Sequence, residues 1–129
     1  MFKVTTSAAM NETFARAFNS RHIENLLSLY EPDAALRTDA TTQTCRGKVA
    51  IAAELGKLLG IPGVMVSRTN FCIEVGDIAL LRADYMLTSP EGKTIVAGSS
   101  AEIVRRQTDG SWLYVIDHAA GASLPRVED

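Results

Sequence analysis

The first sixty positions carry hydrophobic residues at the spacing of amphipathic helices. Three segments have an apolar residue at every third or fourth position, which predicts a helix over residues 8–19, a second one capped by Ser20 and a third one beginning after Gly47. Pro32 follows the second helix and ends it, because proline disfavours helix at the preceding residue. The apolar stripes are Met10, Phe14, Ala17 and Phe18, then Ile23, Leu26, Leu27 and Tyr30, then Ile51, Leu55, Leu58 and Leu59.

After Pro62 the apolar residues alternate with polar ones, which predicts β-strands. Long strands are expected after a short one at residues 34–37, and glycine-containing turns separate them. Their ranges are 64–75, 78–88, 93–107 and 111–118. Strands joined by short turns form an antiparallel meander, and helices followed by strands indicate an α+β fold. We therefore expect one α+β domain over residues 1–129.

The turn residues set the register of the strands. Residues 90–92 and 108–110 are typical of three-residue hairpin loops with glycine in the left-handed position. This register predicts a nearly apolar face on which Asp117 is the single carboxylate. We expect that face to pack on the helices and to leave room for a cavity, because many of its side chains are small. Its residues are Ala79, Leu81, Ala83, Tyr85, Ile95, Ala97, Ser99, Ala101, Ile103, Leu113, Val115 and Asp117.

The opposite face of the predicted sheet mixes charged and aromatic side chains. Such a composition suits either a solvated surface or a dimer interface. We expect a homodimer through this outer face, because Trp112, Tyr114 and Ile116 share it and the helices leave it uncovered. The residues of this face are Arg82, Asp84, Ser100, Glu102, Trp112, Tyr114, Ile116 and His118.

A second register is possible for the last hairpin. A two-residue turn at positions 109–110 would place Glu102 directly opposite Asp117 on one face. Two neighbouring carboxylates raise each other's proton affinity, so this register would create an acid–base pair. The sequence leaves both registers open.

Composition narrows the class of protein. A length of 129 residues fits one domain, and 47% hydrophobic with 22% charged residues argues against disorder. A formal net charge of −2 argues against a basic surface for nucleic acid, and no apolar run reaches the roughly 20 residues of a membrane helix. The first residues lack the pattern of a signal peptide, so we expect a cytoplasmic protein.

The sequence lacks the motifs of metal and cofactor sites. His22 and His118 are far apart, and no histidine pair has ligand spacing. Cys45 and Cys72 lack CxxC spacing and are expected to be reduced thiols inside the fold. No phosphate-binding glycine loop and no serine-hydrolase elbow occurs. We therefore expect no metal and no cofactor.

Several stretches resemble the nuclear-transport-factor-2-like superfamily, in the order in which that group carries them. Residues 17–26 resemble its helix-break-helix opening, and residues 29–36 (LYEPDAAL) resemble its entry to the first strand. Gly47 resembles the start of its third helix, and residues 76–79 and 105–112 resemble its later hairpins. The superfamily includes ketosteroid isomerase, scytalone dehydratase and SnoaL-like polyketide cyclases. The resemblance implies a cone-shaped fold in which three N-terminal helices pack on a strongly curved, mostly antiparallel sheet that encloses a pocket, commonly as a homodimer without a cofactor.

The catalytic residues of the isomerase can be carried over through residues 30–36. Its hydrogen-bonding tyrosine falls at Phe14, and its proton-shuttling aspartate falls at Thr38, one position before Asp39. Its second, protonated acid falls near Glu102 if no bulge intervenes. Phe14 cannot donate a hydrogen bond and Thr38 cannot act as a base near neutral pH. We therefore expect no steroid isomerisation by that mechanism.

Asp117 is the strongest catalytic candidate, because a carboxylate in an apolar pocket has a raised pKa that suits acid–base chemistry. Its alternative role is structural, as a loop cap or as the partner of a buried arginine. Asp39 is the second catalytic candidate, at the strand end where this fold opens its pocket, and is otherwise a turn residue. The candidate ligand-binding residues are Phe14, Phe18, Tyr30, Thr38, Leu55, Tyr85 and Ser99.

Two functions from different classes follow. The first is a cofactor-free acid–base enzyme of the isomerase, cyclase or dehydratase type, acting on a small and largely apolar organic molecule. The second is a non-catalytic module that binds a ligand or forms a dimer. An enzyme is expected to hold at least two polar groups that converge inside the cavity, whereas a module can have one satisfied carboxylate and otherwise apolar walls.

Overall fold

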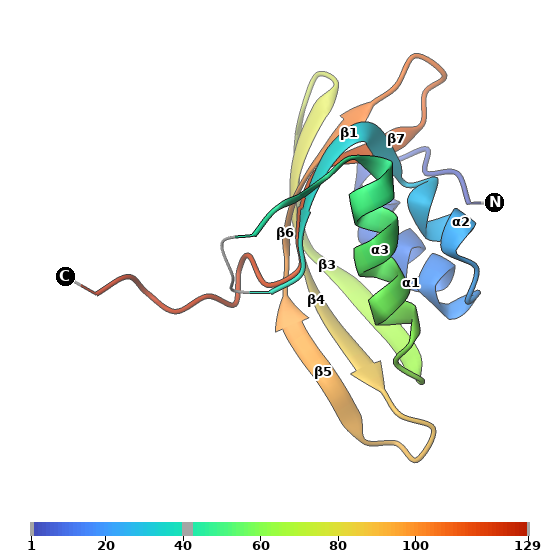
Figure 1. The fold of residues 1–129 in the computed structure, drawn as a ribbon. Coiled ribbons are helices and arrows are strands. Elements are labelled where there is room, and N and C mark those ends of the chain that lie inside the picture. The colour runs from blue at the N-terminus through green and yellow to red at the C-terminus, as the bar shows by residue number, and fades with distance from the viewer. Residues whose placement is uncertain (1, 40–42, 129) are drawn as a thin grey trace.

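The computed structural model describes residues 2–39 and 43–128, and Figure 1 shows the helices on one face of a curved sheet. The elements are η1 (Ser7–Ala9), α1 (Met10–Asn19), α2 (Ile23–Leu27), β1 (Tyr30–Arg37), β2 (Cys45–Arg46), α3 (Gly47–Leu59), β3 (Val64–Val75), β4 (Ile78–Thr88), β5 (Thr94–Ser99), β6 (Ala101–Arg106) and β7 (Trp112–His118). Along the sheet the strands lie in the order β2-β1-β7-β6-β4-β3, and β5 pairs with β4. This open α+β arrangement confirms the predicted fold class. No helix in the described ranges is long and apolar enough to cross a membrane.

The core lies between the helices and the concave face of the sheet. Phe18 on α1 and both Ile51 and Leu55 on α3 are at most 1% exposed, as the apolar stripes predict. They pack against the inward residues of the middle strands, which include Leu81 and Val104. The helices cover one face only, so the opposite face of the sheet is the outer face of the molecule (Figure 1).

The second helix is shorter, and the first strand longer, than the sequence predicts. Tyr30 is the first residue of β1 rather than the last apolar position of a helix. Pro32 therefore lies inside a strand. The parallel pairing of β1 with β7 is interrupted between Tyr30 and Ala35, and a proline without an N–H group is tolerated where a ladder is interrupted.

The hairpin between β4 and β5 has the predicted loop but a different register beyond it. The N–H of Ser89 bonds to the carbonyl of Lys93 at 2.7 Å, which closes the three-residue loop. Pairing then steps from Thr88 with Thr94 to Leu87 with Val96, so the residue between them is a β-bulge.

This bulge at Ile95 reverses the faces of all later residues of β5, and β6 continues the same register along β4. The predicted inward positions from residue 97 to residue 103 therefore lie on the outer face. Ser99 is one of them, and its hydroxyl donates to Asp84 on that face at 2.7 Å. Ser100 and Glu102 point inward instead, with 4% exposure each.

A second bulge reverses part of β7. The loop at residues 108–110 is the predicted one, with the N–H of Gln107 bonded to the carbonyl of Ser111 at 2.7 Å. Val104 pairs with Tyr114, but the preceding residue of β6 pairs with Ile116, which leaves Val115 unpaired.

Before the bulge the even-numbered residues of β7 point inward, and after it the odd-numbered residue Asp117 points inward. Trp112 and Tyr114 are 3% and 1% exposed and belong to the core, so their predicted position on the outer face is wrong. Asp117 is inward as predicted, with 7% exposure. Of the aromatic and apolar residues expected on the outer face of β7, Ile116 remains there at 48% exposure.

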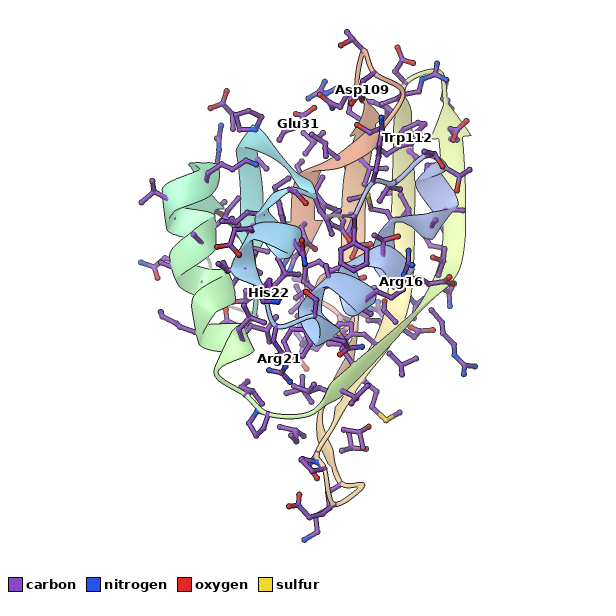
Figure 2. The ribbon with its side chains drawn as sticks, turned by 90° about the vertical axis from the view of Figure 1, so that its right-hand side faces the viewer. Arg16, Arg21, His22, Glu31, Asp109 and Trp112 are labelled. Carbon is purple, nitrogen blue, oxygen red and sulfur yellow. The ribbon has the colours of Figure 1, made fainter. Side chains whose placement is uncertain are left out.

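Arg21 ties the turn between α1 and α2 to the chain that leaves α3. Its φ of 63° lies in the left-handed region, and Figure 2 labels it between α1 and the lower end of α3. The guanidinium stacks 4.5 Å from the ring centroid of Phe18. It also donates to three backbone carbonyl groups, those of Leu59, Ile61 and Gly63. This contact holds α3 over the sheet.

Candidate active site

A cavity of about 120 Å³ lies between the helices and the concave face of the sheet. Every layer of the fold contributes to its wall. Its large apolar side chains are Phe14 from α1, Leu36 from β1, Leu55 and Leu58 from α3, Met65 from β3 and Leu87 from β4. Its polar side chains include Asn11, Thr38, Ser67, Tyr85, Ser100, Glu102 and Asp117. The cavity is thus an apolar chamber with carboxyl groups on the sheet side.

Glu102 on β6 and Asp117 on β7 are direct cross-strand partners. They are also buried, with 4% and 7% exposure. The bulge at Val115 brings them together, since without it Glu102 would lie opposite the neighbouring residue of β7. The pairing predicted for the alternative register is therefore present, although a bulge produces it rather than a two-residue turn.

A tyrosine from the first strand holds Asp117. Tyr30 is fully buried, and its hydroxyl donates to Oδ2 of Asp117 at 2.5 Å. This bond depends on the early start of β1, which brings Tyr30 beside Tyr114 in the parallel pairing with β7. Oδ1 of Asp117 has no hydrogen bond to another side chain among the described residues, so it is available to a ligand.

An amide from the first helix holds Glu102. Nδ2 of Asn11 donates to Oε1 of Glu102 at 2.9 Å. Oδ1 of Asn11 accepts the hydroxyl proton of Tyr114 at 2.6 Å, which fixes the orientation of the amide. The rings of Tyr30 and Tyr114 lie 4.9 Å apart. A different side chain therefore donates to each carboxyl group. Tyr30 bonds to Asp117 directly, and Tyr114, which packs on Tyr30, orients the amide that bonds to Glu102.

Burial and proximity raise the proton affinity of both acids. Burial, and then the charge of Asp117, raise the pKa of Glu102 to about 8, although hydrogen bonds from Ser100 and Asn11 oppose the change. Burial also raises the pKa of Asp117 to about 6, and the bond from Tyr30 opposes it. The two groups titrate as a pair. Because each group disfavours ionisation of the other, the pair holds one proton and one negative charge at neutral pH.

Some predicted ligand-binding residues line the cavity and others do not. Phe14, Thr38, Leu55 and Tyr85 contribute to its wall, together with the catalytic candidate Asp117. Phe14 and Thr38, the positions that correspond to the tyrosine and the aspartate of the isomerase, both lie in the wall. The expected lack of steroid isomerisation stays a prediction.

The remaining predicted site residues lie elsewhere. Phe18 is fully buried in the core, and Tyr30 reaches the site only through its bond to Asp117. Ser99 lies on the outer face because of the bulge in β5, so its predicted place in the pocket is wrong. Asp39 follows β1 and is not part of the cavity wall, and its charge acts on His118 instead.

Asn11 is a site residue that was not predicted, although the sequence contains a signal for it. Asn11, Phe14 and Phe18 lie at positions i, i+3 and i+7, so an amide shares the apolar face of the first helix. A polar residue on such a face needs a buried partner. The sequence contains no comparable signal for Ser100, because the bulge at Ile95 decides on which face of the sheet Ser100 lies. No group of three or more metal-ligating side chains occurs among the residues that the structure describes.

Comparison with known proteins places the chain in a family. The model of the SnoaL-like domain matches residues 11–115. A search of curated proteins finds no match.

Solved structures share the fold. A protein of Thiobacillus denitrificans, provisionally called a calcium/calmodulin-dependent protein kinase type II association domain, is 22% identical with a TM-score of 0.77, over 94% of this chain and 98% of that one. A protein with the same provisional name from Xanthomonas campestris is 21% identical with a TM-score of 0.71, over 93% and 86%. A ketosteroid isomerase-like protein of Erwinia carotovora is 20% identical with a TM-score of 0.67, over 89% and 91%. With the family match over most of its length, the chain belongs to the SnoaL-like domain family and has the fold of nuclear transport factor 2 and ketosteroid isomerase.

Proposed function

We propose that this protein binds a small, largely apolar organic molecule in the cavity and moves a proton within it, without a cofactor. The observation that carries the proposal is the buried pair of Glu102 and Asp117, which share one face as cross-strand partners. A pair that holds one proton at neutral pH offers an acid and a base to the same ligand. The reaction is of the isomerase, cyclase or dehydratase type.

The hydrogen bonds assign a role to each carboxyl oxygen. Oδ1 of Asp117 is the base, because Tyr30 occupies Oδ2. Oε2 of Glu102 carries the proton, because Oε1 accepts from Asn11. In the proposed step, Asp117 takes a proton from the carbon next to a carbonyl group, and the electron pair of that C–H bond moves to form an enol. Glu102 donates its proton to the carbonyl oxygen. Asp117 then returns a proton to carbon while the enol O–H proton goes back to Glu102, which restores the carbonyl group and both carboxyl groups.

The enzyme proposal is favoured over a module that only binds. At least two polar groups were expected to converge inside the cavity of an enzyme, and Glu102, Asp117 and Asn11 all contribute to its wall. Such a buried acid pair lowers the stability of the fold at alkaline pH, since burial of a charge costs free energy that packing has to offset. Pairs of this kind are therefore concentrated at functional sites.

A self-association role also has support, on the outer face of the sheet. Ile73, Leu80, Ile103 and Ile116 form a row across four neighbouring strands by their pairing. Ile73, Leu80 and Ile116 are 57%, 41% and 48% exposed. An apolar row of this kind favours contact with another surface, and we propose a second copy of the chain as its partner, related by a two-fold axis. This association is compatible with catalysis in the cavity.

Proton exchange into small ketones tests the enzyme proposal. Cyclohexanone and a panel of other small ketones are incubated with the protein in D₂O, and NMR follows deuterium entry beside the carbonyl. We expect catalysed exchange in the native chain and a loss of at least about 100-fold in both Asp117→Asn and Glu102→Gln. Glu91→Gln is the matched control, because Glu91 lies in the exposed hairpin turn.

Two outcomes would contradict the proposal. Catalysed exchange that survives in Asp117→Asn would show that another group is the base. Absence of catalysed exchange across the whole panel would leave a binding module in place of an enzyme.

A further inference from the structure

We infer that the cavity selects an uncharged molecule with a single ring and one polar end, and that it rejects carboxylates and fused polycycles. This inference rests on the proposed function and names the substrate class of the same site. Three features of the cavity carry it: its volume, the sign of its charge, and the arrangement of its free donors and acceptors.

The volume limits the ligand to about one ring. The cavity measures about 120 Å³, whereas an engineered apolar cavity of about 150 Å³ in another protein holds benzene. Phe14 lines the cavity from the first helix, and Leu55 and Leu58 line it from α3. Since large side chains on regular elements form the wall, a second fused ring does not fit within this volume.

The charge of the cavity disfavours anions. No lysine, arginine or histidine lies among the described residues of its wall. Its acids are Glu102 and Asp117, which together carry one negative charge at neutral pH. A carboxylate or phosphate on the ligand would be desolvated beside that charge without a cation to pair with it, and such a burial is strongly unfavourable.

The free hydrogen-bonding groups specify the polar end of the ligand. Both oxygen and nitrogen of the Asn11 amide are engaged, by Tyr114 and by Glu102. Besides the hydroxyl of Ser100, which also bonds to Glu102, the groups left to a ligand at this end are the carboxyl proton of Glu102 and the acceptor Oδ1 of Asp117. A carbonyl oxygen with a hydrogen-bond donor beside it, or with an acidic C–H beside it, complements both groups. The remainder of the wall is mostly apolar, and the hydroxyl groups of Ser67 and Tyr85 are part of it.

Three amide and acid probes test the inference by binding alone. Benzamide is uncharged with one ring, benzoate has nearly the same shape with a negative charge, and 2-naphthamide adds a fused ring. Binding is followed at pH 7 by NMR chemical shifts of the protein, including the side-chain amide of Asn11. We expect benzamide to bind at least about tenfold more tightly than benzoate, and 2-naphthamide to show no saturable binding. Equal binding of benzoate or of 2-naphthamide would overturn the inference.

Variants separate the charge from the volume. Asp117→Asn removes the negative charge and is expected to raise the affinity for benzoate at least about tenfold. Leu55→Ala enlarges the cavity and is expected to admit 2-naphthamide. Ile51→Ala is the matched control, because Ile51 is buried one turn earlier on α3 and does not line the cavity. Unchanged benzoate affinity in Asp117→Asn would overturn the charge argument.

The binding test and the exchange test have independent outcomes. Selective binding of benzamide without catalysed exchange in ketones would contradict the acid–base reaction and leave the ligand class intact. Catalysed exchange together with equal affinity for all three probes would support the reaction and contradict the ligand class.

Discussion

Glu102 and Asp117 lie opposite each other on antiparallel strands, and a different donor holds each of them. Asn11 reaches Glu102 from the first helix, whereas Tyr30 reaches Asp117 from the first strand. The pair is thus unequal, although both members are acids in the same apolar chamber. Unequal surroundings separate the two proton affinities, which lets one group act as an acid while the other acts as a base.

The first prediction concerns stability against pH. The pKa of Glu102 is raised in the folded chain to about 8, so the folded state binds more protons than the unfolded state between about pH 4.5 and pH 8. The contribution of Glu102 to stability is therefore complete below its unfolded pKa and is lost as the pH rises through its folded pKa. Chemical denaturation should give a free energy of unfolding that falls between about pH 4.5 and pH 8 and levels off at higher pH.

The substitution Glu102→Gln should remove most of that decline. At pH 9 the variant should be more stable than the native chain, because glutamine stays uncharged and can keep an oxygen acceptor for Asn11. Glu91→Gln, on the exposed turn, should leave the decline unchanged. A decline of equal size in Glu102→Gln would mean that other groups produce it.

The second prediction concerns the hydrogen bond from Tyr30 to Asp117. The substitution Tyr30→Phe removes a bond that stabilises the charged carboxylate, so the pKa of Asp117 should rise further. The acidic limb of the exchange rate against pH should move to higher pH, and stability should fall by on the order of 1 kcal/mol. A stability loss without a shift of the limb would make Tyr30 a structural residue only.

The third prediction concerns Arg21. The substitution Arg21→Ala removes the donor to three carbonyl groups between α3 and β3, and should lower the melting temperature by several degrees. Arg21→Gly should cost less than Arg21→Ala, because glycine adopts the φ of 63° without steric strain. Lys57→Ala is the control for loss of an exposed charge on α3. Equal melting temperatures for Arg21→Ala and the native chain would contradict a tethering role.

The fourth prediction concerns self-association. Light scattering at micromolar concentration should give twice the monomer mass of 13.9 kDa. The substitution Leu80→Lys places a charge in the apolar row of the outer face and should produce a folded monomer. Val49→Lys is the control, because Val49 is 88% exposed on α3, away from the sheet. A native chain that is a monomer under these conditions would contradict the dimer.

Local sequence patterns were sufficient for the fold class and for most elements, although Tyr30 and Pro32 belong to β1 rather than to the end of a helix. The helical stripes of the first sixty residues, and the change to alternation after Pro62, correspond to helices packed on strands. Both three-residue hairpin loops occur as predicted, because glycine at positions 92 and 110 supplies the positive φ that the loop needs. The inward position of Ala79, Leu81 and Ala83 on β4 follows from the same alternation.

Only the tertiary structure decided that Glu102 lies opposite Asp117. Single-residue bulges at Ile95 and Val115 each reverse the side of every later residue in their strands, and together they bury Glu102, Trp112 and Tyr114 while keeping Asp117 inward. Neither bulge has a glycine or another local sequence signal. A bulge costs local hydrogen bonds, and it persists here because the core gains the burial of large side chains several strands away. Local sequence thus determined the strands and turns of this protein, whereas long-range packing determined the register that assembles the acid pair.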